Sequence, residues 1–256
     1  MLEARQLSLS IAGFTLLQDI NLQVKPGEVT AIIGPNGAGK TSLLRLLCGE
    51  IKPSSGDVIF NGLSFDQWQP KQLARILGVL PQSSVLNFPF TAREVVMMGR
   101  IPHSTGLTKD TEIVDAVLDL VGGSYLDKRP YTQMSGGEKQ RVQLARVLAQ
   151  IWEPNASGDR ILILDEPTSA FDLAHQQLTL DIVKSFVQQG VGVLLVVHDL
   201  NLAASCADQL VMLSCGRLVA KGSPQTVLST ELIEQVFNVS VSVGVHPKTG
   251  APLVIV

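Results

Sequence analysis

The chain has 256 residues, of which 45% are hydrophobic, and its formal net charge is −3. No apolar run approaches the roughly 18 to 20 residues that a membrane-spanning helix needs, so we expect any membrane part of a complex to be another chain. The small negative charge and the scattered Lys and Arg residues argue against nucleic-acid binding. The first residues do not resemble an export leader, and Cys48, Cys206 and Cys215 lack metal-ligand spacing, which predicts a protein of the reducing cytosol.

The first strong signal along the chain is a glycine-rich loop between a predicted strand and a predicted helix. Residues 29–33 form an apolar run, and a leucine-rich helical pattern follows the loop and stops at Gly49. Between them GPNGAGKT, at residues 34–41, fits the pattern G-x-x-x-x-G-K-[ST]. In such a loop the glycines turn backbone N–H groups toward phosphate oxygens, Lys40 reaches the outer phosphates, and Thr41 offers a hydroxyl to Mg²⁺. The sequence therefore predicts a nucleotide phosphate site.

A mainly helical insert is predicted for residues 85–157, after a short apolar strand at residues 76–80 and Gln82. A capping box formed by Thr91 and Glu94 predicts the start of a helix within it. We expect a permease helix to dock near Gln82, so that ATP binding is transmitted as a rigid rotation of the insert. Candidates for the receiving groove, some of which must belong to the insert's own core, are Val85, Leu86, Phe88, Phe90, Val95 and Val96.

The string MSGGE, at residues 134–138, predicts a second anion-binding element. Ser135 and Glu138 have the spacing of a capping box that begins a helix. Gly136 and Gly137 lower the helix propensity of the first turn, but they expose N–H groups at the positive end of the helix dipole. A chain whose own phosphate loop is complete has little use for a second such element. We therefore expect it to serve the nucleotide of another copy in a head-to-tail dimer.

Acidic and imidazole side chains follow two further apolar runs. Asp165 and Glu166 come directly after residues 161–164, and His198 comes directly after residues 193–197. Continuous apolar runs of this length are typical of strands buried on both faces of a parallel sheet, and ligands lie at the carboxyl ends of such strands. Asp165 suits a magnesium ligand, and Glu166 suits a group that polarises an attacking water or accepts its proton. An imidazole at the position of His198 is able to contact a γ-phosphate.

These motifs, in this order, resemble those of ABC transporter ATP-binding subunits over nearly the whole chain. The resemblance implies an α/β fold: a P-loop NTPase (RecA-like) core with a mainly parallel sheet, an N-terminal antiparallel β-subdomain and a helical ABC subdomain. It implies a homodimer that sandwiches two ATP molecules with Mg²⁺. The implied ATP-binding residues are Gly34, Pro35, Asn36, Gly37, Ala38, Gly39, Lys40, Thr41 and Ser42, with Ser135, Gly136, Gly137 and Glu138 of the signature. The implied metal-site residues are Thr41, Gln82 and Asp165, the catalytic ones are Lys40, Gln82, Glu166 and His198, and the D-loop is residues 169–172.

Two positions depart from the family pattern. The signature reads MSGGE where LSGGQ is commonest, with Met134 and Glu138 at its ends. The aromatic residue that usually stacks on adenine is replaced by Ile11, and Phe14 follows three residues later. Phe14 either lies over the base or packs against its own hairpin.

A closer resemblance, to the haemin-importer ATPases of the iron-chelate and vitamin B12 group, lies in residues 81–103, 152–160 and 196–204. It implies haemin uptake through separate polytopic permease subunits, two in number, with an extracytoplasmic substrate-binding protein. The ATPase would lie peripherally on the cytoplasmic face of the inner membrane and would not contact haem. The alternatives are a ferric siderophore or vitamin B12 as cargo, or a cytosolic ABC ATPase acting on a soluble complex.

One cassette accounts for the whole length. We expect residues 1–84 and 158–222 to form the nucleotide-binding core, residues 85–157 the helical subdomain, and residues 223–256 an appendage. From residue 231 onward, valine alternation around a Pro-Lys-Thr-Gly turn predicts a small strand pair of unreadable role. Five further residues of types that ligate haem are interpreted as surface or core positions instead: His103, His175, His246, Met97 and Met98.

Overall fold

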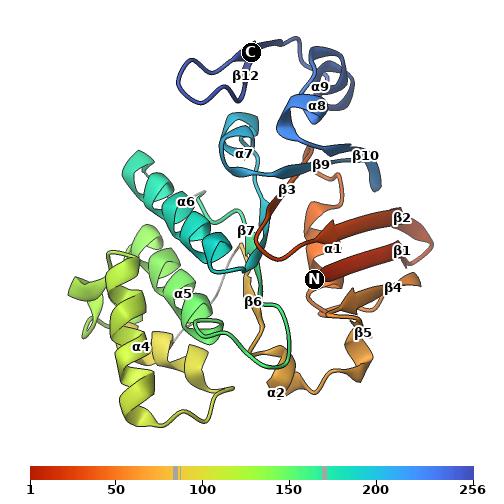
Figure 1. Ribbon diagram of the computed structural model, residues 1–256. Helices are drawn as coiled ribbons and strands as arrows, with labels where there is room; N and C mark the ends of the chain where they lie inside the picture. The colour runs from red at the N-terminus through yellow and green to blue at the C-terminus, as the bar shows by residue number, and fades with distance from the viewer. Residues whose placement is uncertain (83–85, 87, 169–171) are drawn as a thin grey trace. The chain divides into compact units, whose positions relative to one another are not determined.

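The structure is a computed structural model, and it describes residues 1–82, 86, 88–168 and 172–256. The chain forms two compact units, one of residues Met1–Gln67 with Gly192–Val256 and the other of residues Trp68–Val191 (Figure 1). Within the described ranges, no helix has the length and apolarity needed to cross a membrane. These unit borders differ from the predicted borders of the helical subdomain, which lie at residues 84 and 158. The predicted subdomain borders stay a prediction.

The first unit contains an antiparallel sheet in the order β2-β1-β4-β5. Its strands are β1 (Leu2–Ile11), β2 (Phe14–Val24), β4 (Ser55–Phe60) and β5 (Leu63–Ser64), and the short 3₁₀ helix η1 (Phe65–Gln67) follows them. The side chains of Leu7, Leu9 and Leu17 are buried on one face of the sheet. Ile11 pairs with Phe14 across the turn that joins the two long strands. The predicted N-terminal antiparallel β-subdomain is confirmed.

The same unit contains four strands of the mainly parallel sheet, in the order β10-β9-β3-β8. They are β3 (Val29–Ile33), β8 (Gly192–Val196), β9 (Gln209–Ser214) and β10 (Arg217–Gly222), with helices α1 (Lys40–Leu47) and α7 (Leu200–Cys206). β3 runs parallel to both β8 and β9, whereas β10 is antiparallel to β9. Every residue of β3 and β8 is buried, as the apolar runs predicted.

The C-terminal part of this unit comprises α8 (Pro224–Val227), α9 (Thr230–Phe237), β11 (Ser242–Val245) and β12 (Pro252–Ile255). β11 and β12 form the predicted antiparallel pair. The prediction of strands from residue 231 onward was wrong for its first part, because this part is helix α9. The Ser229 side chain caps this helix by accepting a hydrogen bond from the N–H of Leu232, and Ile233 is fully buried. Its apolar residues follow helical spacing rather than alternation.

The second unit is mainly helical, and the predicted helical insert of residues 85–157 lies within its range. The unit has two parallel strands, β6 (Leu77–Leu80) and β7 (Ile161–Asp165). Its α-helices are α2 (Pro70–Leu73), α3 (Ala92–Met97), α4 (Leu107–Leu120), α5 (Gly136–Gln150) and α6 (Leu173–Gln188), and its 3₁₀ helices are η2 (Met98–Arg100), η3 (Ser124–Leu126) and η4 (Tyr131–Gln133). Helix α5 packs against α3, α4 and β6, and its apolar face is buried. With six mainly parallel strands, an antiparallel β-sheet and a helical region, the predicted fold class is confirmed.

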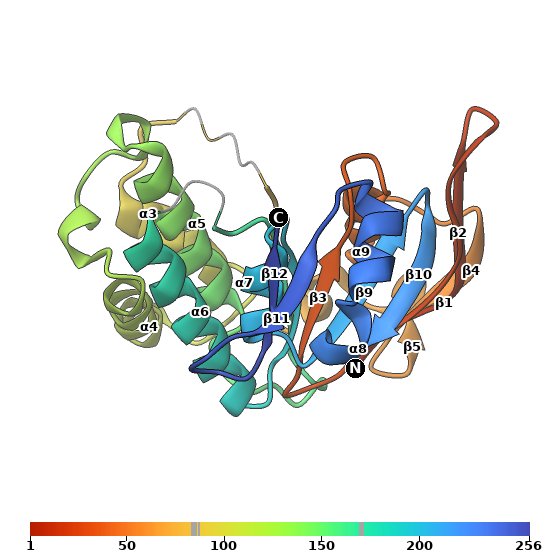
Figure 2. The same ribbon diagram turned by 90° about the horizontal axis from the view of Figure 1, so that it is seen from above.

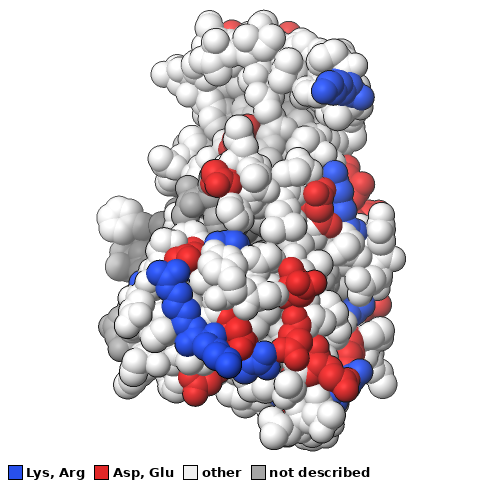
Figure 3. Space-filling view, turned by 90° about the vertical axis from the view of Figure 1, so that its left-hand side faces the viewer, with Lys and Arg blue, Asp and Glu red and all other residues white. Residues whose placement is uncertain are grey.

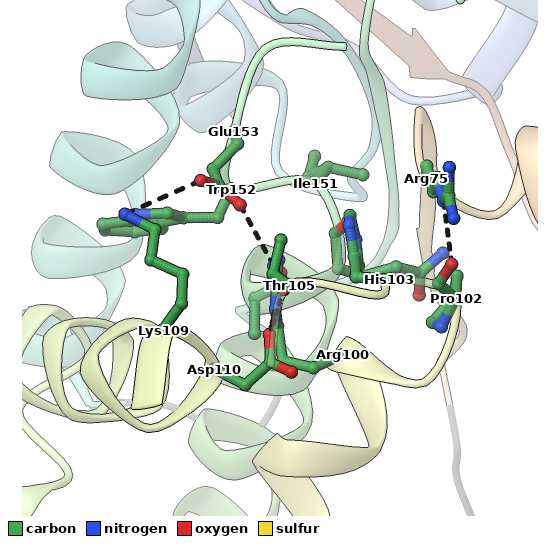
Figure 4. A network of polar contacts seen from close by, with 12 residues as sticks. Arg75, Arg100, Pro102, His103, Thr105, Lys109, Asp110, Ile151, Trp152 and Glu153 are labelled. Atoms are coloured by element: carbon green, nitrogen blue, oxygen red, sulfur yellow. Dashed lines mark hydrogen bonds and ion pairs between the residues drawn. The ribbon is translucent and has the colours of Figure 1, made fainter. Parts of the chain in front are cut away.

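A buried arginine joins the helices of the second unit (Figure 4). The Arg100 side chain is only 1% exposed. Its guanidinium donates to Asp110 Oδ1 at 2.8 Å, to Glu153 Oε2 at 3.0 Å and to the carbonyl oxygen of Ala149 at 2.8 Å. Two carboxylates and a carbonyl thus compensate a charge that would be costly to bury alone.

The helical side of the second unit carries mixed charge. Figure 3 shows Lys and Arg side chains directly beside Asp and Glu side chains in the lower part of this view. Arg93 forms ion pairs with Asp115 and, at 2.6 Å, with Asp127 in this unit. Neighbouring charges of opposite sign limit the electrostatic field that this face projects.

Candidate active site

The glycine-rich loop lies between β3 and α1, as its motif predicted. Gly34, Gly37 and Gly39 have φ angles of 149°, 78° and 101°. A Cβ atom on Gly34 would lie 2.2 Å from the carbonyl oxygen of Leu213, and one on Gly39 would lie 2.8 Å from Leu17 Cδ2. The loop therefore needs glycine both for its backbone angles and for the close approach of its neighbours.

Lys40 is the first residue of α1, and it is buried. Its ammonium group donates to the carbonyl oxygen of Gly34 at 2.8 Å and to that of Pro35 at 3.0 Å. Gly39, which precedes the helix, gives α1 no side-chain cap. The first amide groups of α1 and a fixed positive charge thus lie at the same helix start, which suits a phosphate.

Asp165 is the last residue of β7, and Glu166 follows it directly. Asp165 is buried, and Glu166 has a positive φ of 49°, which side-chain-bearing residues rarely adopt. Gln82 Nε2 donates to Glu166 Oε2 at 2.9 Å. Gln140 Nε2 donates to the carbonyl oxygens of Glu166 at 3.3 Å and Pro167 at 2.8 Å. The structure thus brings predicted Gln82 and Glu166 together, and Gln140 of α5 holds the turn that carries Glu166.

His198 is exposed and follows β8 as predicted. Asp199, the next residue, caps α7: its Oδ1 accepts from the N–H groups of Asn201 at 2.8 Å and Leu202 at 3.0 Å. The predicted D-loop falls largely outside the described residues, which resume at Asp172.

The signature begins α5 with the predicted capping box. Ser135 Oγ accepts from the N–H of Glu138 at 3.3 Å, and the N–H of Ser135 donates to Glu138 Oε2 at 2.8 Å. The pKa of Glu138 is lowered from its usual value, mainly by the hydrogen bond from the backbone N–H of Ser135 and next by the Ser135 side chain. The positive charge of Arg129 lowers it further. Arg129 Nη1 donates to Glu138 Oε1 at 2.8 Å. A Cβ on Gly136 would meet no atom within 4 Å, so packing within the chain does not require glycine there.

The two residues considered for adenine stacking lie at the tip of the β1–β2 hairpin. Phe14 is 75% exposed and Ile11 is 54% exposed. Phe14 therefore makes little contact with its own hairpin, and this favours a position over the adenine base rather than packing against the hairpin.

The other histidines make local contacts. His103 is half-buried, its Nε2 lies 2.8 Å from the carbonyl oxygen of Gln150, and burial lowers its pKa. His175 Nδ1 lies 2.7 Å from Asp172 Oδ1. Among the described residues, no group of His, Cys, Asp and Glu has the arrangement of a metal site.

Sequence reasoning missed Gln140 and Arg129. Gln140 reaches residues 26 and 27 positions away, and no local pattern announces such a contact. For Arg129 a signal was available. The signature ends in Glu138 where a glutamine is commonest, and a carboxylate at that position favours a nearby cation such as Arg129.

A glycine loop followed by a lysine at a helix start, and a buried strand that ends in an aspartate with a glutamate directly after it, are the features of a P-loop nucleotide-hydrolysing protein. A family model described as "ABC transporter" matches residues 17–169, which is more than half of the chain. The chain belongs to this family and is an ABC-type ATPase.

Individual proteins match over the full length. The chain is 48% identical to the "Hemin import ATP-binding protein HmuV" of Gloeobacter violaceus, with coverage of 100% of this chain and 94% of the relative. It is also 48% identical to the protein of the same name from Pseudomonas entomophila, with coverage of 100% and 99%. A solved structure of a metal-chelate type ABC transporter in an inward-facing conformation aligns with a TM-score of 0.80 and 25% identity, over 99% of this chain and 96% of that one.

Proposed function

We propose that this chain is the ATP-hydrolysing subunit of a haemin importer, which acts as a head-to-tail homodimer beneath a separate permease. The observation that carries the proposal is 48% identity to a hemin import ATP-binding protein over the whole chain, including the residues beyond the family model. In this function the subunit works at the cytoplasmic face of the membrane and does not contact haem. An extracytoplasmic binding protein delivers the cargo to the permease.

ATP binding is assigned to the phosphate loop. Loop N–H groups and Lys40 bind the phosphates, because the three glycines with positive φ and the helix start form a cradle for anions. Hydroxyl and carboxylate oxygens are donors that Mg²⁺ prefers, so Thr41 of the first unit and Asp165 of the second are each proposed as magnesium ligands, together with Gln82. When bound, Mg²⁺ supplies charge neutralisation of the phosphate oxygens.

Hydrolysis is assigned to Glu166, which orients the attacking water or accepts its proton. Gln82 is hydrogen-bonded to this carboxylate, and Gln140 holds its backbone in a conformation that costs about 1 kcal/mol or more. His198 contacts the γ-phosphate. Phe14 stacks on the adenine, since most of its ring is accessible.

The signature serves the nucleotide of the opposite copy. The start of α5 offers the hydroxyl of Ser135 and the N–H groups of Gly136 and Gly137. Gly136 is not required by packing within its own chain. A glycine that the chain itself does not need is consistent with close approach of a phosphate from outside.

A permease helix docks on exposed apolar residues of the second unit. Phe88 is 67% exposed and Phe90 is 36% exposed, and their rings lie 6.0 Å apart. Val95 and Val96 are fully buried, so they are the members of the predicted set that belong to the core. Val85 lies outside the described residues.

Affinity purification of the chain from detergent-solubilised native membranes tests the function. Recovery of a polytopic permease, and stimulation of the reconstituted ATPase by haemin, is the expected result. A permease complex that responds to a ferric siderophore or vitamin B12 instead would change the cargo. Recovery of soluble partners alone would contradict the importer and favour a cytosolic ABC ATPase.

A trapping variant tests the chemistry separately. Glu166→Gln is expected to bind ATP normally and to stop hydrolysis, so that dimers accumulate in MgATP on a sizing column. Near-normal hydrolysis by this variant would sink the assignment of Glu166.

A further inference from the structure

One side chain ties the segment after His198 to the C-terminal hairpin. Asn201 lies in the first turn of α7, and its Nδ2 donates to the carbonyl oxygen of Val254 at 2.9 Å. Its Oδ1 accepts from the N–H of the same residue at 2.7 Å. The amide group thus pairs with the backbone of β12 as a neighbouring strand would. Figures 1 and 2 show β12 next to α7, and the two elements are in contact.

The backbone of the first turn of α7 is also held by hydrogen bonds to Asp199. Asp199 follows His198 directly, and its carboxylate accepts from the N–H groups of Asn201 and Leu202. The backbone of Asn201 is therefore fixed to Asp199, while its side chain is fixed to Val254. A short chain of hydrogen bonds leads from β12 to the residue beside His198.

Side-chain packing next to His198 is incomplete. A hollow of about 270 Å³ lies between the start of α7 and the C-terminal elements. Its lining includes His198, Leu200, Phe237, Val241, Val254 and Val256. A hollow of this size has room for several water molecules, so the side chains that line it do not fill all the space between the start of α7 and the C-terminal elements. The hydrogen bonds of Asn201 supply the link across it.

We propose that the C-terminal hairpin, β11 with β12, positions the His198 segment through Asn201. Asn201 is then a positioning residue for ATP hydrolysis that acts through the backbone of residues 198–200. The inference rests on the proposed role of His198 and adds a role for the appendage.

The test is Asn201→Ala in the full-length ATPase, with Ser205→Ala as the matched control. Ser205 is exposed on the same helix, and its hydroxyl donates to the carbonyl oxygen of Leu202 within that helix. Asn201→Ala is expected to lower kcat about tenfold with little change in the KM for ATP, because His198 is misplaced while the phosphate loop is intact. Ser205→Ala is expected to leave both constants unchanged. An unchanged kcat for Asn201→Ala would overturn the proposal.

Removal of the hairpin's last strand provides a second measurement. A chain that ends at Gly250 lacks β12, and it is expected to show the same loss of kcat as Asn201→Ala. The two changes combined are expected to give no further loss, because they break the same link. Additive losses would contradict the proposed route, since each change would then act independently.

His198→Ala separates this inference from the function on which it rests. If His198→Ala keeps full turnover, the proposed role of His198 fails, and the effect on kcat fails with it. If His198→Ala is inactive and Asn201→Ala is fully active, only the present inference fails. Amide hydrogen exchange reports the link directly: Asn201→Ala is expected to speed exchange both in β12 and at residues 197–200, and faster exchange confined to β12 would refute the coupling.

Discussion

The helices α1 and α5 both begin at glycine-rich motifs, but their first turns are built in opposite ways. α1 follows Gly39 without a side-chain cap, and Lys40 turns back onto the loop carbonyls. α5 begins with a complete capping box between Ser135 and Glu138. A helix start without a cap has more N–H groups for a phosphate, whereas a capped one is already stable and contributes fewer groups. In the proposed function, the uncapped start of α1 therefore serves as the main phosphate site and the capped start of α5 as a secondary one.

The largest expected effect is on ATP affinity, and it comes from Lys40 at the uncapped start of α1. Lys40→Ala removes a charged donor, and loss of a charge-assisted hydrogen bond lowers ATP affinity by about 10- to 100-fold. Titration calorimetry with ATP measures the change. Lys52→Ala, at an exposed lysine that pairs with Asp66, is the control and is expected to bind ATP normally. Equal affinity in both variants would show that Lys40 does not contact the phosphates.

Gly136→Ala tests whether the capped start meets a nucleotide. Outside its own helical turn, the added methyl group meets no atom within 4 Å, and alanine favours helix, so the melting temperature is expected to stay the same or rise slightly. Turnover is expected to fall about tenfold, since the methyl group obstructs a phosphate of the opposite copy. Thermal unfolding and steady-state ATPase rates measure the two effects. Full activity would show that nothing approaches Gly136.

Two capping boxes allow a matched comparison. Thr91 caps α3 in the same way that Ser135 caps α5. Thr91→Ala and Ser135→Ala are each expected to lower the free energy of unfolding by about 1 kcal/mol. Ser135→Ala alone is expected to reduce ATP turnover as well. Equal turnover in the two variants, measured at matched folded fractions, would assign Ser135 to capping only.

The pair of Arg129 and Glu138 gives a smaller effect. Arg129→Gln leaves the Glu138 carboxylate uncompensated at a helix start that is to receive a phosphate, so turnover is expected to fall a few-fold. Glu138→Gln in the same chain is expected to restore it, because no negative charge then needs compensation. Steady-state rates of the two single variants and the double variant measure this coupling. A double variant no better than Arg129→Gln would assign Arg129 a purely structural role.

The smallest effect depends on pH. The pKa of Glu138 is lowered in the folded chain, mainly by the N–H of Ser135, so its charged form stabilises the fold above the pKa of an unfolded glutamate. This contribution is lost as the pH falls through the lowered value. The difference in melting temperature between the chain and its Glu138→Gln variant is therefore expected to shrink from pH 7 toward pH 3. A constant difference would contradict the pKa direction.

The sequence predicted the elements that have strong local signals. Continuous apolar runs predicted β3, β7 and β8 because strands covered on both faces need apolar side chains throughout. Capping spacing predicted the starts of α3 and α5. Helix α9 was missed, because its apolar residues lie close to a valine-rich strand segment that dominates the pattern.

Contacts between distant residues had no such signal. Gln140 reaches the turn at Glu166, and Asn201 reaches Val254, 53 residues further along the chain. Glutamine and asparagine are common on exposed helix surfaces, so their presence predicts no partner. The motifs thus predicted a set of candidate site residues, which stays a prediction, but they did not predict the side chains that hold the turn at Glu166 and the start of α7 in place.

The Arg100 network has a consequence for the order of events during synthesis. Two acceptors of this guanidinium, the carbonyl of Ala149 and the carboxylate of Glu153, lie 49 and 53 residues after it in the chain. Helices α3 and α4 are complete much earlier, yet the arginine between them has only part of its counter-charge until Glu153 has left the ribosome. The full set of partners of the Arg100 guanidinium therefore exists only once the chain has been synthesised through Glu153, beyond the end of α5.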